Sequence, residues 1–130
     1  MESETRRIID RNADKKPIYF DGISLPWETI MDTHLGKQFK DLKMIYQAET
    51  GLAVNLSVYP KGYYKVRHVH GCSHGIFVLS GRLKTDEGVF GPGTFVWYPE
   101  GTVMSHGATE DEDCLFLYIQ DREGSFEYLE

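Results

Sequence analysis

Three histidines lie close together inside a frame of glycines, and this frame constrains the fold more than any other feature of the chain. The spacing is Gly62, five residues, His68, one residue, His70, three residues, His74, six residues and Gly81. On a β-strand, side chains two positions apart project from the same face, so His68 and His70 are expected to point in one direction. Glycine at each end is typical of a turn. The frame therefore predicts two short neighbouring strands that gather imidazoles on one side.

A fourth histidine, His106, follows on what we expect to be a more distant strand. Histidine is the commonest side-chain metal ligand, because its neutral ring offers a lone pair at physiological pH. Four imidazoles suit a divalent transition metal, with Fe(II) or Zn foremost and Ni, Mn or Cu as alternatives, and they give little reason for calcium or magnesium. The competing interpretation is that the histidines are scattered and only structural. The spacing favours one metal site, with the candidate ligands His68, His70, His74 and His106.

Strand-like segments separated by glycine- or proline-containing turns repeat along the chain after residue 42. Residues 52–59 alternate Leu, Val, Leu and Val with Ala, Asn, Ser and Tyr, which is the pattern of a half-buried strand. Short strands at this spacing are typical of an all-β sandwich or barrel. The expected strands are residues 42–49, 52–59, 64–70, 75–80, a hairpin over 82–90, 94–98, 102–106 and 114–120.

The chain is expected to divide into two parts within one domain. Residues 1–41 are predicted to form an N-terminal arm and edge segment that packs on a barrel, and residues 42–130 are predicted to form the barrel itself. Residues 25–41 are weakly patterned, so we expect them to be irregular, with one short strand or one turn of helix as the alternative.

Composition excludes several classes of protein. The net charge is −6, so no basic footprint for nucleic acid is present, and no apolar run approaches the length of a membrane span. The acidic N-terminus is unlike a secretory signal, and two cysteines do not form a disulfide framework. We therefore expect a cytoplasmic protein without nucleic-acid or membrane partners.

The glycine–histidine frame resembles the first motif of the cupin superfamily, the RmlC-like barrels. A second motif is similar to residues 93–106, where Gly93 is followed after five residues by Pro99, then Gly101 and His106. The resemblance implies a small double-stranded β-helix, that is, a jelly-roll barrel, with an N-terminal extension. Two departures stand out. His74 occupies the place of the usual glutamate, and the spacer before His106 is longer than usual with no asparagine after it.

Within the superfamily the chain resembles small proteins near acetylacetone dioxygenase and the cupin domain of zinc-binding anti-sigma factors. The first resemblance implies an Fe(II)-dependent dioxygenase-type enzyme acting on a small diketone or aromatic ketone, with His68, His70 and His106 as shared ligands. His74 would then be a fourth ligand or a neighbour of the ligands. The second implies a zinc-binding cupin that senses a ligand without turnover. Three histidines leave positions open for catalysis, whereas four would close a tetrahedral zinc shell.

Strand alternation also predicts which side chains line a pocket. Counting back from the histidines places Tyr64, Met104 and Ile76 on the inner face, so we expect a mostly apolar pocket for a small-molecule substrate. Cys72 lies between His70 and His74, where it could be a soft ligand, a redox-sensitive thiol or a loop residue.

The segment from Gly75 to Ser80 is apolar on both faces. A strand of this kind must be covered on both sides. We therefore predict a homodimer, with cover by the N-terminal segment that carries Trp27 and Phe39 as the alternative.

Overall fold

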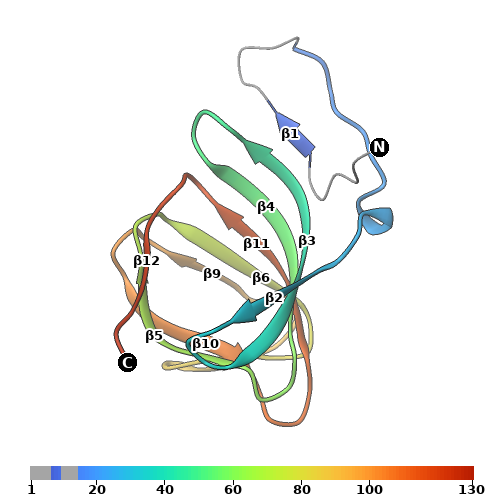
Figure 1. The fold of residues 1–130 in the computed structure, drawn as a ribbon. Coiled ribbons are helices and arrows are strands. Elements are labelled where there is room, and N and C mark those ends of the chain that lie inside the picture. The colour runs from blue at the N-terminus through green and yellow to red at the C-terminus, as the bar shows by residue number, and fades with distance from the viewer. Residues whose placement is uncertain (1–6, 10–14) are drawn as a thin grey trace.

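The protein is an all-β barrel made of two facing sheets, antiparallel except for one parallel pair at the edge of the larger sheet, as the computed structural model shows for residues 7–9 and 15–130 (Figure 1). This architecture confirms the predicted fold class. The strands are β1 (Arg7–Ile9), β2 (Glu28–Asp32), β3 (Lys37–Gln47), β4 (Leu52–Tyr59), β5 (Tyr64–His70), β6 (His74–Ser80), β7 (Leu83–Thr85), β8 (Gly88–Phe90), β9 (Phe95–Tyr98), β10 (Val103–Ala108), β11 (Cys114–Gln120) and β12 (Phe126–Tyr128), and a 3₁₀ turn, η1, spans Gly22–Ser24.

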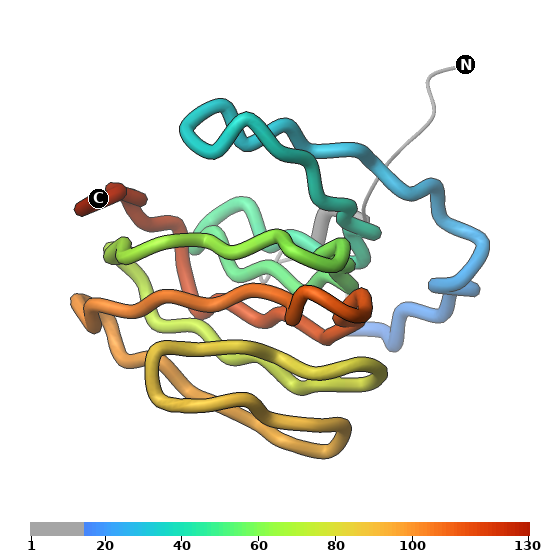
Figure 2. Tube along the Cα trace, turned by 90° about the horizontal axis from the view of Figure 1, so that it is seen from below, coloured from blue at the N-terminus to red at the C-terminus, as the bar shows by residue number. Residues whose placement is uncertain are grey.

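The two sheets are built from strands that are distant in sequence. The larger sheet has the order β1-β3-β4-β11-β6-β9, with β2 added to β3, and the smaller has the order β12-β5-β10-β7-β8. Figure 2 shows the two layers from below, with the C-terminal strand beside β5. β5 and β10 lie in the smaller sheet and β6 in the larger, so the four histidines come from both walls of the barrel.

Alternation and turn chemistry explain why these residues form these strands. β4 and β11 pair in continuous antiparallel register, from Cys114 opposite Tyr59 to Gln120 opposite Ala53. Gly81, the last glycine of the frame, has φ of 75°, and a Cβ there would collide with the backbone carbonyl of Asp113. Only glycine fits this turn without strain.

The core fills the space between the sheets next to the histidines. Its wholly buried members include Ile76, Val78, Leu83 and Phe116, and partly buried Phe39 packs against them. Phe39 is therefore an interior residue and does not cover the outer face of β6. Leu25 of the N-terminal segment and Leu42 of β3 are both buried.

The N-terminal part of the chain is more regular than the weak pattern predicted. β2 is a short strand within the weakly patterned segment 25–41, as the alternative for that segment allowed, and it pairs antiparallel with β3. β3 begins at Lys37, so the boundary expected between residues 41 and 42 lies inside a strand. Residues 1–6 and 10–14 of the predicted arm lie outside the described residues.

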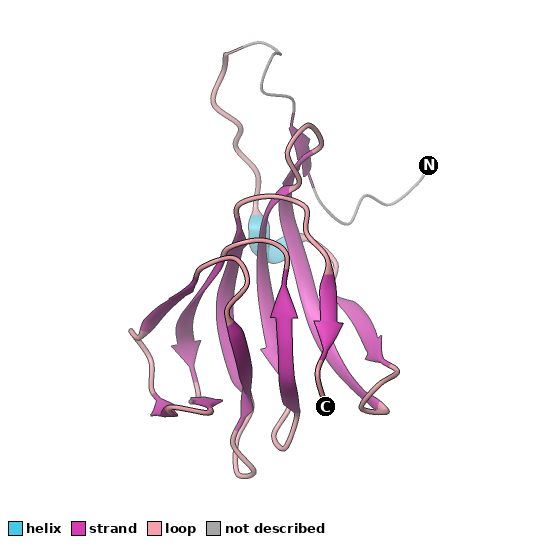
Figure 3. Cartoon of the chain, turned by 90° about the vertical axis from the view of Figure 1, so that its left-hand side faces the viewer, coloured by secondary structure: helices cyan, strands magenta, loops and turns pink. Residues whose placement is uncertain are grey.

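The C-terminal strand β12 was not expected, because Phe126–Tyr128 is too short to show a pattern. Strands make up nearly all the regular structure (Figure 3). Among the residues described, no helix has the length and apolar character needed to cross a bilayer.

Candidate metal centre

The four histidines singled out by the sequence converge inside the barrel. The ring centroids of His68 and His106 are 4.9 Å apart, those of His68 and His70 are 5.2 Å apart, and those of His70 and His74 are 4.1 Å apart. His74 and His106 are more distant, at 6.2 Å. His68, His70 and His106 each offer a ring nitrogen within 4.8 Å of the others, which is a group able to hold a metal ion.

These imidazoles are buried without hydrogen-bond partners for several of their nitrogens. The unpaired atoms are Nε2 of His68, His70 and His106 and both ring nitrogens of His74, counted against the residues that the structure describes. A buried polar atom without a partner costs about 1–3 kcal/mol, so five of them in one place require an explanation. A bound divalent ion satisfies imidazole nitrogens of this kind, and the donor set fits a borderline transition metal.

Hydrogen bonds on the other side of two rings orient these free nitrogens. His68 Nδ1 lies 2.7 Å from the carbonyl oxygen of Val66, which can only accept, so His68 carries its proton on Nδ1 and its lone pair on Nε2. His106 Nδ1 lies 3.2 Å from the hydroxyl of Tyr59. Partners of this type fix the ring orientation of metal-binding histidines.

Burial keeps the four rings neutral, which metal binding requires. Desolvation lowers the pKa of His68 and of His74 to about 4 and that of His70 to about 2. It also lowers the pKa of His106 well below the ordinary value. At neutral pH each ring can therefore donate a lone pair.

A β-bulge in β5 decides which other side chains face the histidines. Met104 is opposite His68 and His106 is opposite Lys65, so two residues of β5 stand against the single residue Ser105 of β10. The extra residue shifts the alternation, and Lys65 shares the inner face with His68. Counting by twos from His68 could not find Lys65, because the separation is odd.

Lys65 places a cationic group beside the histidines. Its Nζ lies 5.0 Å from the ring centroid of Phe39 and 4.9 Å from that of Phe126. Within the described residues, no carboxylate lies within 4.0 Å of this ammonium. Desolvation lowers the pKa of Lys65, while the more distant Asp32 and Asp41 carboxylates oppose that change.

A cavity of about 210 Å³ opens directly onto the histidines. It is bounded by Lys65, His70 and His106 on one side and by inner-face residues of β3, β4 and β11 on the other. Its walls are more polar than expected, because the far sheet turns amides, a hydroxyl and a carboxylate inward. The residues of that far wall are Phe39, Asp41, Asn55, Ser57, Tyr59, Phe116, Tyr118 and Gln120.

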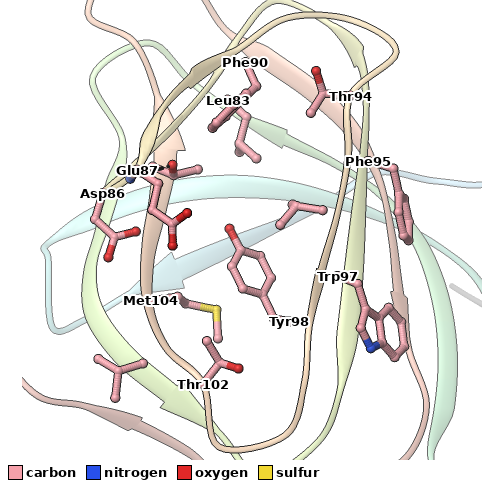
Figure 4. Close-up of a pocket in the computed structure, with 13 residues that line it drawn as sticks. Leu83, Asp86, Glu87, Phe90, Thr94, Phe95, Trp97, Tyr98, Thr102 and Met104 are labelled. Atoms are coloured by element: carbon pink, nitrogen blue, oxygen red, sulfur yellow. Dashed lines mark hydrogen bonds between the residues drawn. The ribbon is translucent and has the colours of Figure 1, made fainter.

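A second and larger cavity, of about 320 Å³, lies between the β7–β8 hairpin and β9. Figure 4 shows Tyr98 and Met104 pointing into it, with Asp86 and Glu87 at its rim. The Tyr98 ring also lies 5.0 Å from that of His74, so this side chain separates the larger cavity from the histidines. We take the smaller cavity as the candidate ligand site, because among the described cavities only this one is lined by candidate metal ligands, His70 and His106.

The residues expected to line the pocket lie in three different places. Met104 lines the larger cavity, and Ile76 is wholly buried in the core. Tyr64 places its hydroxyl 2.5 Å from Ser105 Oγ and its ring 5.0 Å from Lys84 Nζ. Tyr64 therefore lies on the other face of the bulged strand from Lys65.

Cys72 belongs to a second group of potential ligands. His70, Cys72 and His74 each offer one ligand atom, and these atoms lie within 4.8 Å of one another. Cys72 and Cys114 are both free thiols and both buried.

Comparison with known proteins identifies the type of barrel. A family model described as the ChrR cupin-like domain matches residues 15–122. No curated protein sequence matches the chain.

Solved structures share the fold at low sequence identity. An RmlC-like cupin protein of Ralstonia eutropha is 20% identical, with a TM-score of 0.69, and the match covers 85% of this chain and 72% of that one. The structure of Rhodobacter sphaeroides SigE in complex with the anti-sigma ChrR gives 19% identity, a TM-score of 0.60 and coverage of 75% and 50%. A candidate dioxygenase of Nostoc punctiforme gives 13% identity, a TM-score of 0.75 and coverage of 85% and 41%.

Proposed function

The chain belongs to the ChrR cupin-like domain family, and from this premise we propose that it is a metal-dependent enzyme of the dioxygenase type. Its substrate is a small diketone or aromatic ketone, bound in the cavity beside the histidines, and O₂ is the second substrate. The metal is a divalent transition ion, Fe(II) in the catalytic form.

One observation carries this proposal: buried imidazole nitrogens without partners meet at the wall of a cavity. His68, His70 and His106 would hold the ion through Nε2, and His70 and His106 border the open space. A closed structural site needs no cavity beside it, whereas a catalytic site keeps positions free for substrate. When bound, the ion supplies Lewis acidity and, as iron, redox chemistry with O₂.

The chain's own residues would bind and orient an enolate. A deprotonated diketone carries one negative charge shared by two oxygens, and Lys65 offers an ammonium without a close carboxylate partner on the same face as the histidines. The Asn55 amide, in the opposite wall, offers N–H groups to a carbonyl oxygen. Phe39 and Phe126, which flank the ammonium, exclude water from the charge pair and strengthen it.

A second candidate function is a zinc-binding cupin that senses a ligand without turnover. His74 favours it, because this ring is wholly buried and both its nitrogens lack partners in the described part of the chain. If His74 joins the other three ligands, a tetrahedral zinc shell is complete and no position remains for O₂.

Metal content and O₂ uptake distinguish the two functions. We expect untagged wild-type protein to contain iron by elemental mass spectrometry, His106→Ala to lose it, and His74→Ala to keep most of it. The iron-loaded protein should then consume O₂ with a member of a panel of diketones and aromatic ketones. Full zinc occupancy that is lost in both variants, without O₂ uptake, would support the sensing function instead.

We also propose that the protein is a homodimer that uses the outer face of the larger sheet. Phe95 and Trp97 of β9 are 54% and 47% exposed, and Phe77 of β6 stands opposite Phe95. β11 and β4 continue this apolar face with the half-buried residues Leu115, Leu117, Ile119, Val54, Leu56 and Val58. A sheet apolar on both faces needs a cover, and a second copy offers a matching surface.

A cytoplasmic location is part of the same proposal. Cys72 and Cys114 are free thiols, which is the ordinary state of cysteine in a reducing compartment. Detection of the protein in the soluble cytoplasmic fraction of its cells would test this.

A further inference from the structure

We propose that His70, Cys72 and His74 form a second, thiolate-containing coordination position, which takes a thiophilic ion such as Cu(I), Zn or Cd(II). This second position shares His70 with the three-histidine position, so one chain would offer two alternative coordination sites for a single ion. The inference thus deepens the proposed metal centre, because it states what decides the position and identity of the metal.

The loop between β5 and β6 directs the thiol inward. The Gly71 N–H donates to the carbonyl of Ser125 at 2.7 Å, and the Ser73 N–H donates to the Asp121 carboxylate at 3.0 Å. Both residues beside Cys72 are thus fastened to the segment that follows β11. Cys72 between them is only 3% exposed, although it lies at a loop tip.

The His74 ring is an independent indication that an ion binds at this position. Its side chain is wholly buried, and neither Nδ1 nor Nε2 has a partner among the described residues. An ion held with His68, His70 and His106 would satisfy at most one of these two atoms. The thiol of Cys72 lies within 4.8 Å of a ligand atom of His74 and of His70, which is close enough for the three to surround an ion after small rotations.

The donor set determines which ions would choose this position. Thiolate is a soft ligand that selects Cu(I), Zn and similar ions, whereas three imidazoles with open positions suit Fe(II). Formation of the metal–sulfur bond displaces the thiol proton to solvent, and no electrons are exchanged. Cys114 is also free and buried but belongs to no ligand group of the described residues, so it is a matched control.

Cadmium is a direct probe, because a cadmium–thiolate bond absorbs in the near ultraviolet through charge transfer. One equivalent of Cd(II) added to the metal-free full-length protein should produce this band in the wild type, in Cys114→Ser and in His106→Ala. The band should be lost in Cys72→Ser. X-ray absorption at the cadmium edge should find one sulfur neighbour in the wild type and in Cys114→Ser.

Two results would overturn the inference: no charge-transfer band in the wild type, or a band that persists in Cys72→Ser. If Cys72→Ser does not fold, a band that is present in both the wild type and Cys114→Ser still assigns the thiolate to Cys72, and a band lost in Cys114→Ser overturns the inference. Failure of the proposed catalytic function has a separate signature, namely absence of O₂ uptake by iron-loaded Cys72→Ser and wild type alike. If Cys72→Ser binds iron and the wild type gives no cadmium band, the three-histidine centre remains supported and the thiolate position is excluded.

Discussion

The hydroxyl of Tyr128 donates a hydrogen bond to the carboxylate of Asp32, although the two residues are 96 positions apart. Tyr63 donates to the same oxygen at 2.8 Å, and the Leu35 N–H reaches the other oxygen at 3.2 Å. This arrangement fastens the last strand to the end of β2. The ring of Tyr128 lies 5.9 Å from that of His68, so the same bond holds one wall of the metal centre.

Substitution of Asp32 by asparagine should destabilise the protein most strongly at neutral pH. Burial raises the pKa of Asp32, but the hydrogen bonds from Tyr128 and Tyr63 outweigh burial and leave the pKa below 3.8. The ionised carboxylate therefore stabilises the fold above pH 3.8, and this contribution is lost as the pH falls further, through the folded pKa. We expect Asp32→Asn to lower the free energy of unfolding by about 1–3 kcal/mol at pH 7 in urea titrations.

Asp41→Asn is the matched control because its pKa shift has the opposite sign. Burial raises the pKa of Asp41 above 3.8. Between pH 3.8 and the folded pKa, the folded protein therefore binds more protons at this site than the unfolded chain does, and the free energy of unfolding falls as the pH rises through this range. The Ser57 hydroxyl, which donates to Asp41 at 2.6 Å, can donate equally to an asparagine oxygen. Asp41→Asn should remove that fall in stability, and equal losses in the two variants would contradict the assignment.

Lys65→Met should weaken binding of an anionic ligand without loss of metal. A hydrogen bond to a charged group contributes about 1.5–3 kcal/mol, which corresponds to roughly a tenfold to hundredfold loss of affinity. Calorimetric titration of zinc-loaded protein with acetylacetone, at a pH where its enolate is present, measures this. Lys84→Met removes a partly buried lysine that lies over Tyr64 and does not line the candidate ligand cavity, so this variant should bind the ligand like the wild type. Equal affinity in all three proteins would exclude Lys65 from the ligand site.

The metal-free protein should lose stability as the pH falls from 6.5 toward 4. His68, His70 and His74 have folded pKa values below the ordinary 6.5, so the unfolded chain binds more protons in this range. Each such histidine lowers the free energy of unfolding by about 1.4 kcal/mol per pH unit between its two pKa values. Urea midpoints measured with a chelator present should fall steeply, and His74→Ala should flatten the slope. A midpoint independent of pH over this range would show that the rings are not held neutral.

Trp97→Arg should convert the proposed dimer to a monomer. Phe95 and Trp97 lie across Gly75, where a Cβ would meet both rings at 3.0 Å or less, so the two aromatic rings lie flat on the outer face of the sheet. A cation placed in this apolar interface would be buried without a partner. Light scattering after gel filtration should report half the wild-type mass, while Ile23→Arg, at an exposed site in η1, should leave the mass unchanged. A wild-type monomer would end the dimer proposal.

The sequence predicted the bounds of a barrel strand well where the strand lies between two partners in its sheet. The ranges expected for β4, β5 and β11 coincide with the observed ones, because their partners on both sides reinforce the pattern. β12 was missed, and the bounds of β2 were not predicted, for a physical reason. Each is a short strand at the edge of its sheet, and its pairing partner, not its own residues, makes it a strand.

The candidate site was likewise predictable in one part, the histidines, and unpredictable in another, the cavity wall. The histidine spacing located the cluster of converging imidazoles, because the segments carrying His68, His70 and His74 obey simple alternation and turn rules. The cavity wall could not be predicted, since it depends on the bulge opposite Ser105 and on the inner face of a sheet distant in sequence. Lys65 lies three positions before His68, and this odd offset assigns it to the opposite face in an unbroken strand.

If β5 paired with β10 without its bulge, Tyr64 and Val66 would face the histidines and Lys65 would face solvent. The same amino acids could thus form either a cationic or an apolar cavity wall, depending on whether the pairing of β5 with β10 shifts by one residue. Preference for charged or neutral ligands in a barrel of this design can therefore diverge between related proteins through a change of strand register alone, with every cavity residue kept.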